Sequence, residues 1–103
     1  MEKNLIQRRQ GDILIMEIAD IPEDAQKQTT NIVARGEVTG HTHRLSAGAQ
    51  AAIMMAGASM YIECLKQSKL LHDEHAPIDL PVGNYKVVRQ QEFLPRGWQQ
   101  VAD

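Results

Sequence analysis

The stretch Ser46–Lys66, SAGAQAAIMMAGASMYIECLK, decides whether this chain is all-β or a mixture of helix and strand. Its alanines favour a helix, with a capping serine before them and a glycine after them. The run between Gly48 and Gly57 is short, however, and so short a helix is marginal without tertiary contacts. Residues 59–65, SMYIECL, alternate as a strand does. We therefore predict a hairpin that turns at residues 56–58, with the helix as the alternative.

Short strands separated by turn residues extend on both sides of this stretch. Residues 11–18, GDILIMEI, are apolar on both faces, which predicts a central strand. Residues 31–39, NIVARGEVT, predict another strand that runs into a pair of histidines. In residues 78–93, IDLPVGNYKVVRQQEF, Pro81 and Gly83 suit a three-residue hairpin loop. With no convincing long helix, this spacing predicts an all-β fold, a small barrel or sandwich.

Length, composition and charge limit what the chain can be. With 103 residues, an apolar fraction of 43% and a charged fraction of 23%, we expect one folded β domain over residues 1–103. Lys and Arg are dispersed and the net charge is -2, which argues against nucleic-acid binding. No apolar run is long enough for a secretory signal or a membrane span, so we expect a cytoplasmic protein with no membrane attachment. Cys64 is the only cysteine, and we expect it to be a small buried side chain.

The four histidines form two tight pairs. His41 and His43 lie in GHTHRL, and alternate residues of a strand point to the same side of a sheet. His72 and His75 lie in LHDEHAP, where a turn brings residues three apart together. If the two pairs pack side by side, three or four ring nitrogens meet, which predicts a divalent metal site for zinc, iron or nickel. The alternative is a structural role, in which the rings hydrogen-bond loop backbone.

Other polar residues near the two pairs are candidates for assisting roles. Glu74 is the candidate general base, or a fourth ligand. Glu37 and Asp73 are candidates to orient the imidazoles from behind. Arg44 would anchor an anion at the rim or pair with a nearby carboxylate, and Tyr85 would line the same cavity or pack in the core. The alternative for Glu37, Asp73 and Glu74 is that each is an ordinary exposed carboxylate.

Three segments resemble a family of small bacterial proteins: QGDILI, GEVTGHTHRL and LHDEHAPIDLPVGNYKVVRQQEF. That family shows the pattern GEvTGHaHR followed by HeEHaPIxLPxGxYxVxRQrEY. The resemblance spans nearly the whole chain and implies no activity, because no function is established for that family. A more distant resemblance is to the cupins, double-stranded β-helix barrels whose metal is held by an H-x-H pair, a downstream Glu and a later His. Here no Glu follows His43 at the cupin spacing.

Two functions are compatible with these observations. The first is a metal-dependent, hydrolase-type activity, in which His41, His43 and one histidine of the second pair hold a divalent ion and Glu74 handles protons. The second is a noncatalytic β module that binds a partner protein or a second copy of itself, with the apolar residues 51–60, AAIMMAGASM, as its contact face. Neither the substrate nor the number of subunits follows from the sequence.

Overall fold

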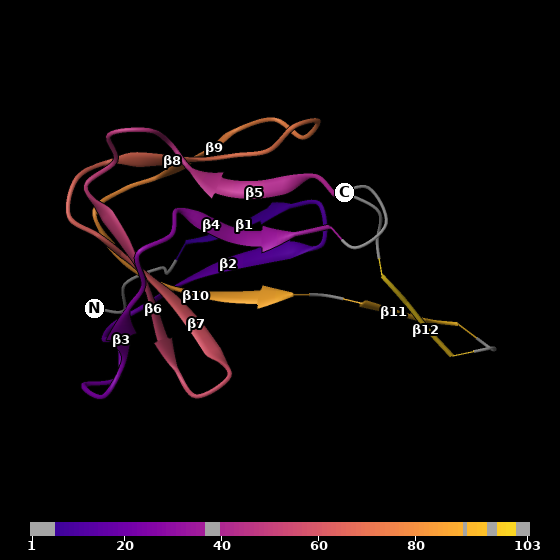
Figure 1. The fold of residues 1–103 in the computed structure, drawn as a ribbon, viewed down its shortest axis with the longest axis horizontal. Coiled ribbons are helices and arrows are strands. Elements are labelled where there is room, and N and C mark those ends of the chain that lie inside the picture. The colour runs from indigo at the N-terminus through magenta and orange to yellow at the C-terminus, as the bar shows by residue number, and fades with distance from the viewer. Residues whose placement is uncertain (1–5, 37–39, 90, 95–96, 101–103) are drawn as a thin grey trace.

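The computed structural model describes residues 6–36, 40–89, 91–94 and 97–100, and the regular structure among them is β-strand throughout (Figure 1). The strands are β1 (Gln7–Gln10), β2 (Ile13–Ile18), β3 (Gln26–Lys27), β4 (Ile32–Arg35), β5 (Thr42–Leu45), β6 (Ala51–Ala56), β7 (Ser59–Cys64), β8 (Ser68–Leu71), β9 (Ile78–Leu80), β10 (Gly83–Arg89), β11 (Gln91–Leu94) and β12 (Gly97–Gln100). The prediction of an all-β fold is confirmed. Within these described ranges, no helix has the length and apolarity needed to cross a membrane.

Two antiparallel sheets pack against each other. The larger sheet has six strands in the order β1-β2-β10-β7-β6-β3, and the smaller has four in the order β4-β5-β8-β9 (Figure 1). Strand β2 lies between β1 and β10, so the predicted central strand is confirmed. The third sheet is the hairpin β11-β12, whose strands pair with each other and which extends away from the two larger sheets in Figure 1.

The stretch that decided the fold is a β-hairpin, as predicted. Strands β6 and β7 pair from Ala51 opposite Cys64 to Ala56 opposite Ser59. Gly57 occupies the turn with a φ of 59°, a left-handed conformation that suits glycine. The helix alternative for residues 46–56 is therefore wrong, because pairing with the alternating β7 overrides the helix preference of the alanines.

The predicted hairpin around Pro81 and Gly83 is wrong. Strand β9 pairs with β8 in the smaller sheet, whereas β10 pairs with β2 and β7 in the larger sheet. Residues 81–82 therefore carry the chain from one sheet to the other. Gly83 has a φ of 154°, and a Cβ on it would lie 3.2 Å from Glu17 Oε2, so the crossing point has little space for a side chain.

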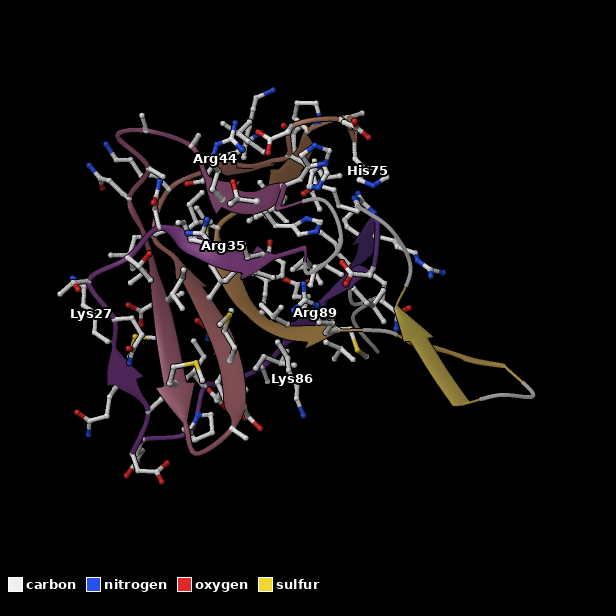
Figure 2. All side chains as sticks on the ribbon, turned by 45° about the vertical axis from the view of Figure 1, so that its right-hand side comes forward. Lys27, Arg35, Arg44, His75, Lys86 and Arg89 are labelled. Carbon is white, nitrogen blue, oxygen red and sulfur yellow. The ribbon has the colours of Figure 1, made fainter. Side chains whose placement is uncertain are left out.

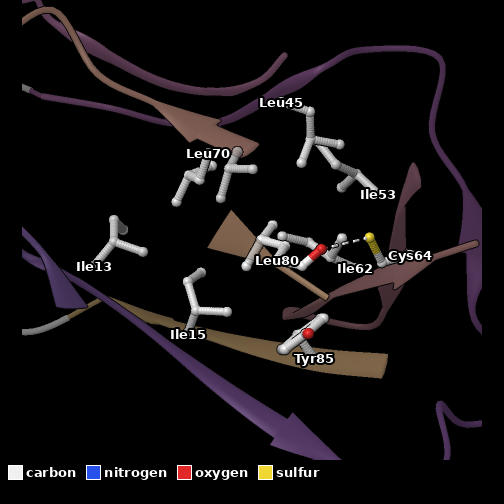
Figure 3. Close-up of a cluster of buried hydrophobic side chains, with 10 residues drawn as sticks. Ile13, Ile15, Leu45, Ile53, Ile62, Cys64, Leu70, Leu80 and Tyr85 are labelled. Atoms are coloured by element: carbon white, nitrogen blue, oxygen red, sulfur yellow. Dashed lines mark hydrogen bonds between the residues drawn. The ribbon is translucent and has the colours of Figure 1, made fainter. Parts of the chain in front are cut away.

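The core lies between the two sheets and both contribute to it (Figure 3). Its buried side chains are, from the larger sheet, Ile13, Ile15, Ile53, Ile62, Cys64 and Tyr85 and, from the smaller sheet, Val33, Leu45, Leu70 and Leu80. Cys64 is 2% exposed, which confirms it as a buried side chain, and its sulfur lies 2.9 Å from the carbonyl oxygen of Lys66 and 3.3 Å from that of Leu80, the two acceptors within reach of its one S–H. Burial of this apolar surface is the main stabilising contribution to the fold.

Candidate functional site

The two histidine pairs lie next to each other in space. His43 is on β5, and His72 follows β8, which pairs with β5 in an antiparallel register that sets Arg44 opposite Leu71. The rings of His43 and His72 have centroids 4.5 Å apart. The ring of His75 lies 4.5 Å from that of His72, and the ring of His41 lies 5.5 Å from it in a T-shaped arrangement. The structure thus brings the four imidazoles together around His72.

His43 is fully buried and its Nδ1 is 2.9 Å from the side-chain oxygen of Gln10. The amide nitrogen of Gln10 donates to the carbonyl oxygens of Leu70 and Ala76 at 3.0 and 2.9 Å. These two bonds fix which end of the amide faces each group, so the Gln10 oxygen has to accept a hydrogen bond from His43 Nδ1. The proton of a neutral His43 ring is therefore on Nδ1, and the lone pair is on Nε2.

Asp12 is the carboxylate that faces His43. It is 1% exposed, and its Oδ1 lies 3.3 Å from His43 Nε2. Its other oxygen, Oδ2, accepts a hydrogen bond of 2.8 Å from Nε of Arg89. A buried carboxylate requires such partners, because an ionised group without compensation is costly inside a protein.

His72 has a different hydrogen-bond pattern from His43. Its Nδ1 accepts from the backbone N–H groups of Glu74 and His75, at 3.0 and 3.1 Å. An Nδ1 that accepts carries no proton, so a neutral His72 ring has its proton on Nε2. An Nε2–H is a hydrogen-bond donor and is not a metal ligand. His72 therefore caps the turn that positions His75.

The rim of the cluster holds the exposed polar residues. His41 Nε2 lies 3.8 Å from Glu74 Oε1, and the Glu74 side chain is 67% exposed. Asp73 accepts a hydrogen bond from the backbone N–H of Thr42 at 3.1 Å and forms an ion pair with Arg44 at 3.0 Å. The Thr42 N–H, helped by the Arg44 guanidinium, holds the pKa of Asp73 below its ordinary value. Asp73 thus connects the loop that carries His72 and His75 to the start of β5.

Two other residues named from the sequence lie elsewhere. Tyr85 is in the hydrophobic core at the start of β10, where its hydroxyl donates to the carbonyl oxygen of Pro81 at 2.6 Å. Burial, together with the Glu17 carboxylate, raises the pKa of Tyr85 to about 12. Glu37 lies outside the described residues.

Gln10 and Asp12 are the residues that sequence reasoning missed. They flank Gly11 in the tight turn between β1 and β2, and this turn reaches the start of β5 from the other sheet. The one sequence signal was a glutamine and an aspartate placed on either side of a turn glycine in QGDILI. That signal places both side chains at the end of a hairpin but does not say which strand they meet.

A metal ion needs several donor atoms that point to one place. Among residues 6–36, 40–89, 91–94 and 97–100, no group of three or more His, Cys, Asp or Glu side chains is arranged so that it could hold an ion. The donor set fits a cation in part: His43 and Asp12 present adjacent donor atoms, whereas Nδ1 of His72 is taken by backbone N–H groups.

Comparison with known proteins adds one match. The family model whose description reads Domain of unknown function (DUF8820) matches residues 9–90. No curated protein and no solved structure matches the chain. The resemblance to an uncharacterised family is thereby confirmed, and the likeness to cupins stays a prediction.

Proposed function

Because the chain belongs to this family of unknown function, we propose its role from its own side chains: the histidine cluster binds a divalent metal ion, with His43 and Asp12 as the first two ligands. The observation that carries the proposal is the separation of 3.3 Å between His43 Nε2 and Asp12 Oδ1, two buried donor atoms. Proteins seldom bury a histidine and a carboxylate together without a charge or hydrogen-bonding reason.

The separation of these two atoms matches that of two ligands of one ion. Bonds from zinc to imidazole nitrogen and to carboxylate oxygen are each about 2.0–2.2 Å, which sets the two donors about 3.3–3.5 Å apart at a tetrahedral angle. An ordinary charge-assisted N–H to carboxylate hydrogen bond is shorter, about 2.7–2.9 Å. The observed 3.3 Å lies in the first range.

The groups behind the two ligands orient them for this role. Ligating histidines usually donate their second ring N–H to a carboxylate, a carbonyl or a water, which fixes the tautomer and the ring plane. Gln10 does this for His43, and its own amide is held by two backbone carbonyls. Arg89 holds the outer oxygen of Asp12, so Oδ1 is the oxygen that faces His43.

A third ligand would come from His41 or His75 by side-chain rotation, since no group of three among the described residues already holds that geometry. Both residues are partly exposed, whereas His72 is buried and its Nδ1 is committed to backbone. A set of imidazoles with one carboxylate suits zinc, iron or nickel. For a hydrolase-type activity, the exposed Glu74 next to His41 would take up the proton.

Isothermal titration of the chelator-treated protein with Zn²⁺ tests the proposal. We expect binding by the wild type, and we expect Asp12→Asn and His43→Gln each to weaken it by at least about tenfold. Asp79→Asn is the matched control, because Asp79 is 59% exposed on β9 and pairs with Lys69. Circular dichroism checks that each variant folds. The proposal fails if the wild type takes up no Zn²⁺, or if Asp12→Asn binds as tightly as Asp79→Asn.

Association with a second copy is the other candidate function. Met54 lies on the face of β6 opposite to the buried Ile53, and it is half-buried in the single chain. The β11-β12 hairpin follows β10 in the chain. In the described residues its two strands form a sheet of their own and do not pair with the larger sheet (Figure 1). Light scattering over a range of concentrations tests this function: Met54→Glu should reduce association, and a wild type that stays monomeric at high concentration rejects it.

A further inference from the structure

We infer that a cavity between the two sheets, next to the histidine cluster, binds a small organic carboxylate with an apolar tail. The cavity has a volume of about 250 Å³. Its lining comes from both sheets and consists of Ile13, Val33, Ala34, Ala58, Met60, Val87 and Arg89. Among the described residues that line the cavity, Arg89 is the one with a polar side chain. The inference does not depend on the proposed metal site.

The apolar part of the lining sets the size and chemistry of the tail. Ile13 and Val33 are buried, and Met60 and Val87 pack against the core, so four aliphatic side chains face the space. An apolar cavity of about 150 Å³ is large enough to bind benzene. The cavity described here is larger, which gives room for a ring of that size and a short polar group. The exposed Ala58 marks the side from which a ligand can enter.

Arg89 supplies the charge that selects an anionic head group. Its Nε donates to Asp12, and its Nη2 donates to the carbonyl oxygen of Arg35, so the guanidinium spans the space between β10 and β4 (Figure 2). A guanidinium has five N–H donors. Two are used in these contacts, and among the residues that the structure describes Nη1 has no hydrogen-bond partner.

The remaining donors suit a carboxylate better than other head groups. The two Nη nitrogens of an arginine present parallel N–H groups that match the two oxygens of a carboxylate. The two existing contacts hold the guanidinium in place, so little conformational entropy is lost when a ligand binds. The side chain is 31% exposed, so a carboxylate can reach it from solvent while its tail enters the apolar space.

The test compares phenylacetate with its uncharged amide, phenylacetamide, on chelator-treated protein. Both probes carry the same ring, and they differ in charge at the position that should meet Arg89. Isothermal titration should give phenylacetate at least about tenfold tighter binding than the amide, because hydrogen bonds to charged groups contribute more than neutral ones. Acetate, which lacks the tail, should bind too weakly to measure. Equal affinities for the acid and the amide would overturn the inference.

Two variants locate the binding. Ala34→Leu fills the cavity without changing a charge and should weaken the binding of phenylacetate by about tenfold or more. Arg89→Lys keeps the charge but removes the parallel N–H groups of the guanidinium. It should therefore reduce the preference for phenylacetate over phenylacetamide. Arg35→Lys is the matched control, since Arg35 offers its backbone to Arg89 and does not line the cavity. Unchanged phenylacetate binding in a folded Ala34→Leu protein would place the ligand elsewhere and reject the inference.

Discussion

Gln10 holds the buried imidazole of His43 in one orientation, and it does so from the opposite sheet. Its side-chain oxygen is 2.9 Å from His43 Nδ1, and its nitrogen donates to the carbonyls of Leu70 on β8 and of Ala76 in the loop that follows β8. One glutamine therefore bonds three polar groups at once, two of them in buried hydrogen bonds. Buried hydrogen-bond networks specify a single arrangement, and loss of one member leaves the others without that partner.

We expect Gln10→Ala to lower the free energy of unfolding by about 2–4 kcal/mol, because buried hydrogen-bonding groups would lose their partner. Urea denaturation followed by circular dichroism measures this change. Gln28→Ala is the control, since the Gln28 amide donates to the Gln26 carbonyl at the surface, and its cost should stay within about 0.5 kcal/mol. Equal costs for the two variants would mean that the Gln10 network adds nothing to stability.

Leu70→Ala tests the packing between the sheets. Leu70 is fully buried in the core between the two sheets, so its truncation should lower the free energy of unfolding by about 2–5 kcal/mol through lost burial and a residual cavity. The same denaturation experiment measures it. Val82→Ala serves as the comparison because Val82 is 63% exposed, and we expect a change of no more than about 0.5 kcal/mol. A small cost at Leu70 would show that the two sheets do not share a core.

Gly57 tests the turn between β6 and β7. A Cβ at this position would meet nothing within 4 Å, so a substitution changes the backbone preference and creates no clash. Because the φ is +59°, Gly57→Ala should lower the free energy of unfolding by about 1–2 kcal/mol. Gly57→Asn should lower it less, because asparagine tolerates this conformation. Thermal melts of the two variants give the comparison. If alanine were tolerated as well as asparagine, the turn would not be left-handed at this residue.

Tyr85 predicts a loss of stability at high pH. Its pKa in the folded protein is raised to about 12 from an ordinary value of 10.0, so folding favours the neutral form. The stabilisation is fully present below pH 10 and is lost as the pH rises between 10 and about 12. Ultraviolet titration of tyrosinate should show one late-ionising tyrosine that Tyr85→Phe removes. Ionisation of Tyr85 near pH 10 in protein that is still folded would contradict this prediction.

Much of the fold could be predicted because local signals decide it. The alternation after Gly57 and the glycine itself specify one hairpin, and the apolar run of β2 specifies an internal strand. The signal at Pro81 and Gly83 was misleading, since turn residues show that the chain changes direction and do not show which sheet the next strand joins.

The candidate site was predictable only in its local part. The turn after β8 brings His72 and His75 together, and the pairing of β5 with β8 brings His41 and His43 to the ring of His72. Asp12 and Gln10 could not be assigned to the site from sequence. Their contacts with His43 span about thirty residues of chain and depend on how one sheet docks on the other.

The position of β10 in the larger sheet has a consequence for synthesis of the chain. This strand is the last to be made of the six, yet it lies between β2 and β7 and is hydrogen-bonded to both. Until residues 83–89 have left the ribosome, the strands already made can form only two separate pieces, β1-β2 and β7-β6-β3. Arg89 is the final residue of that strand, so the contact that secures Asp12 is made at the end of the process.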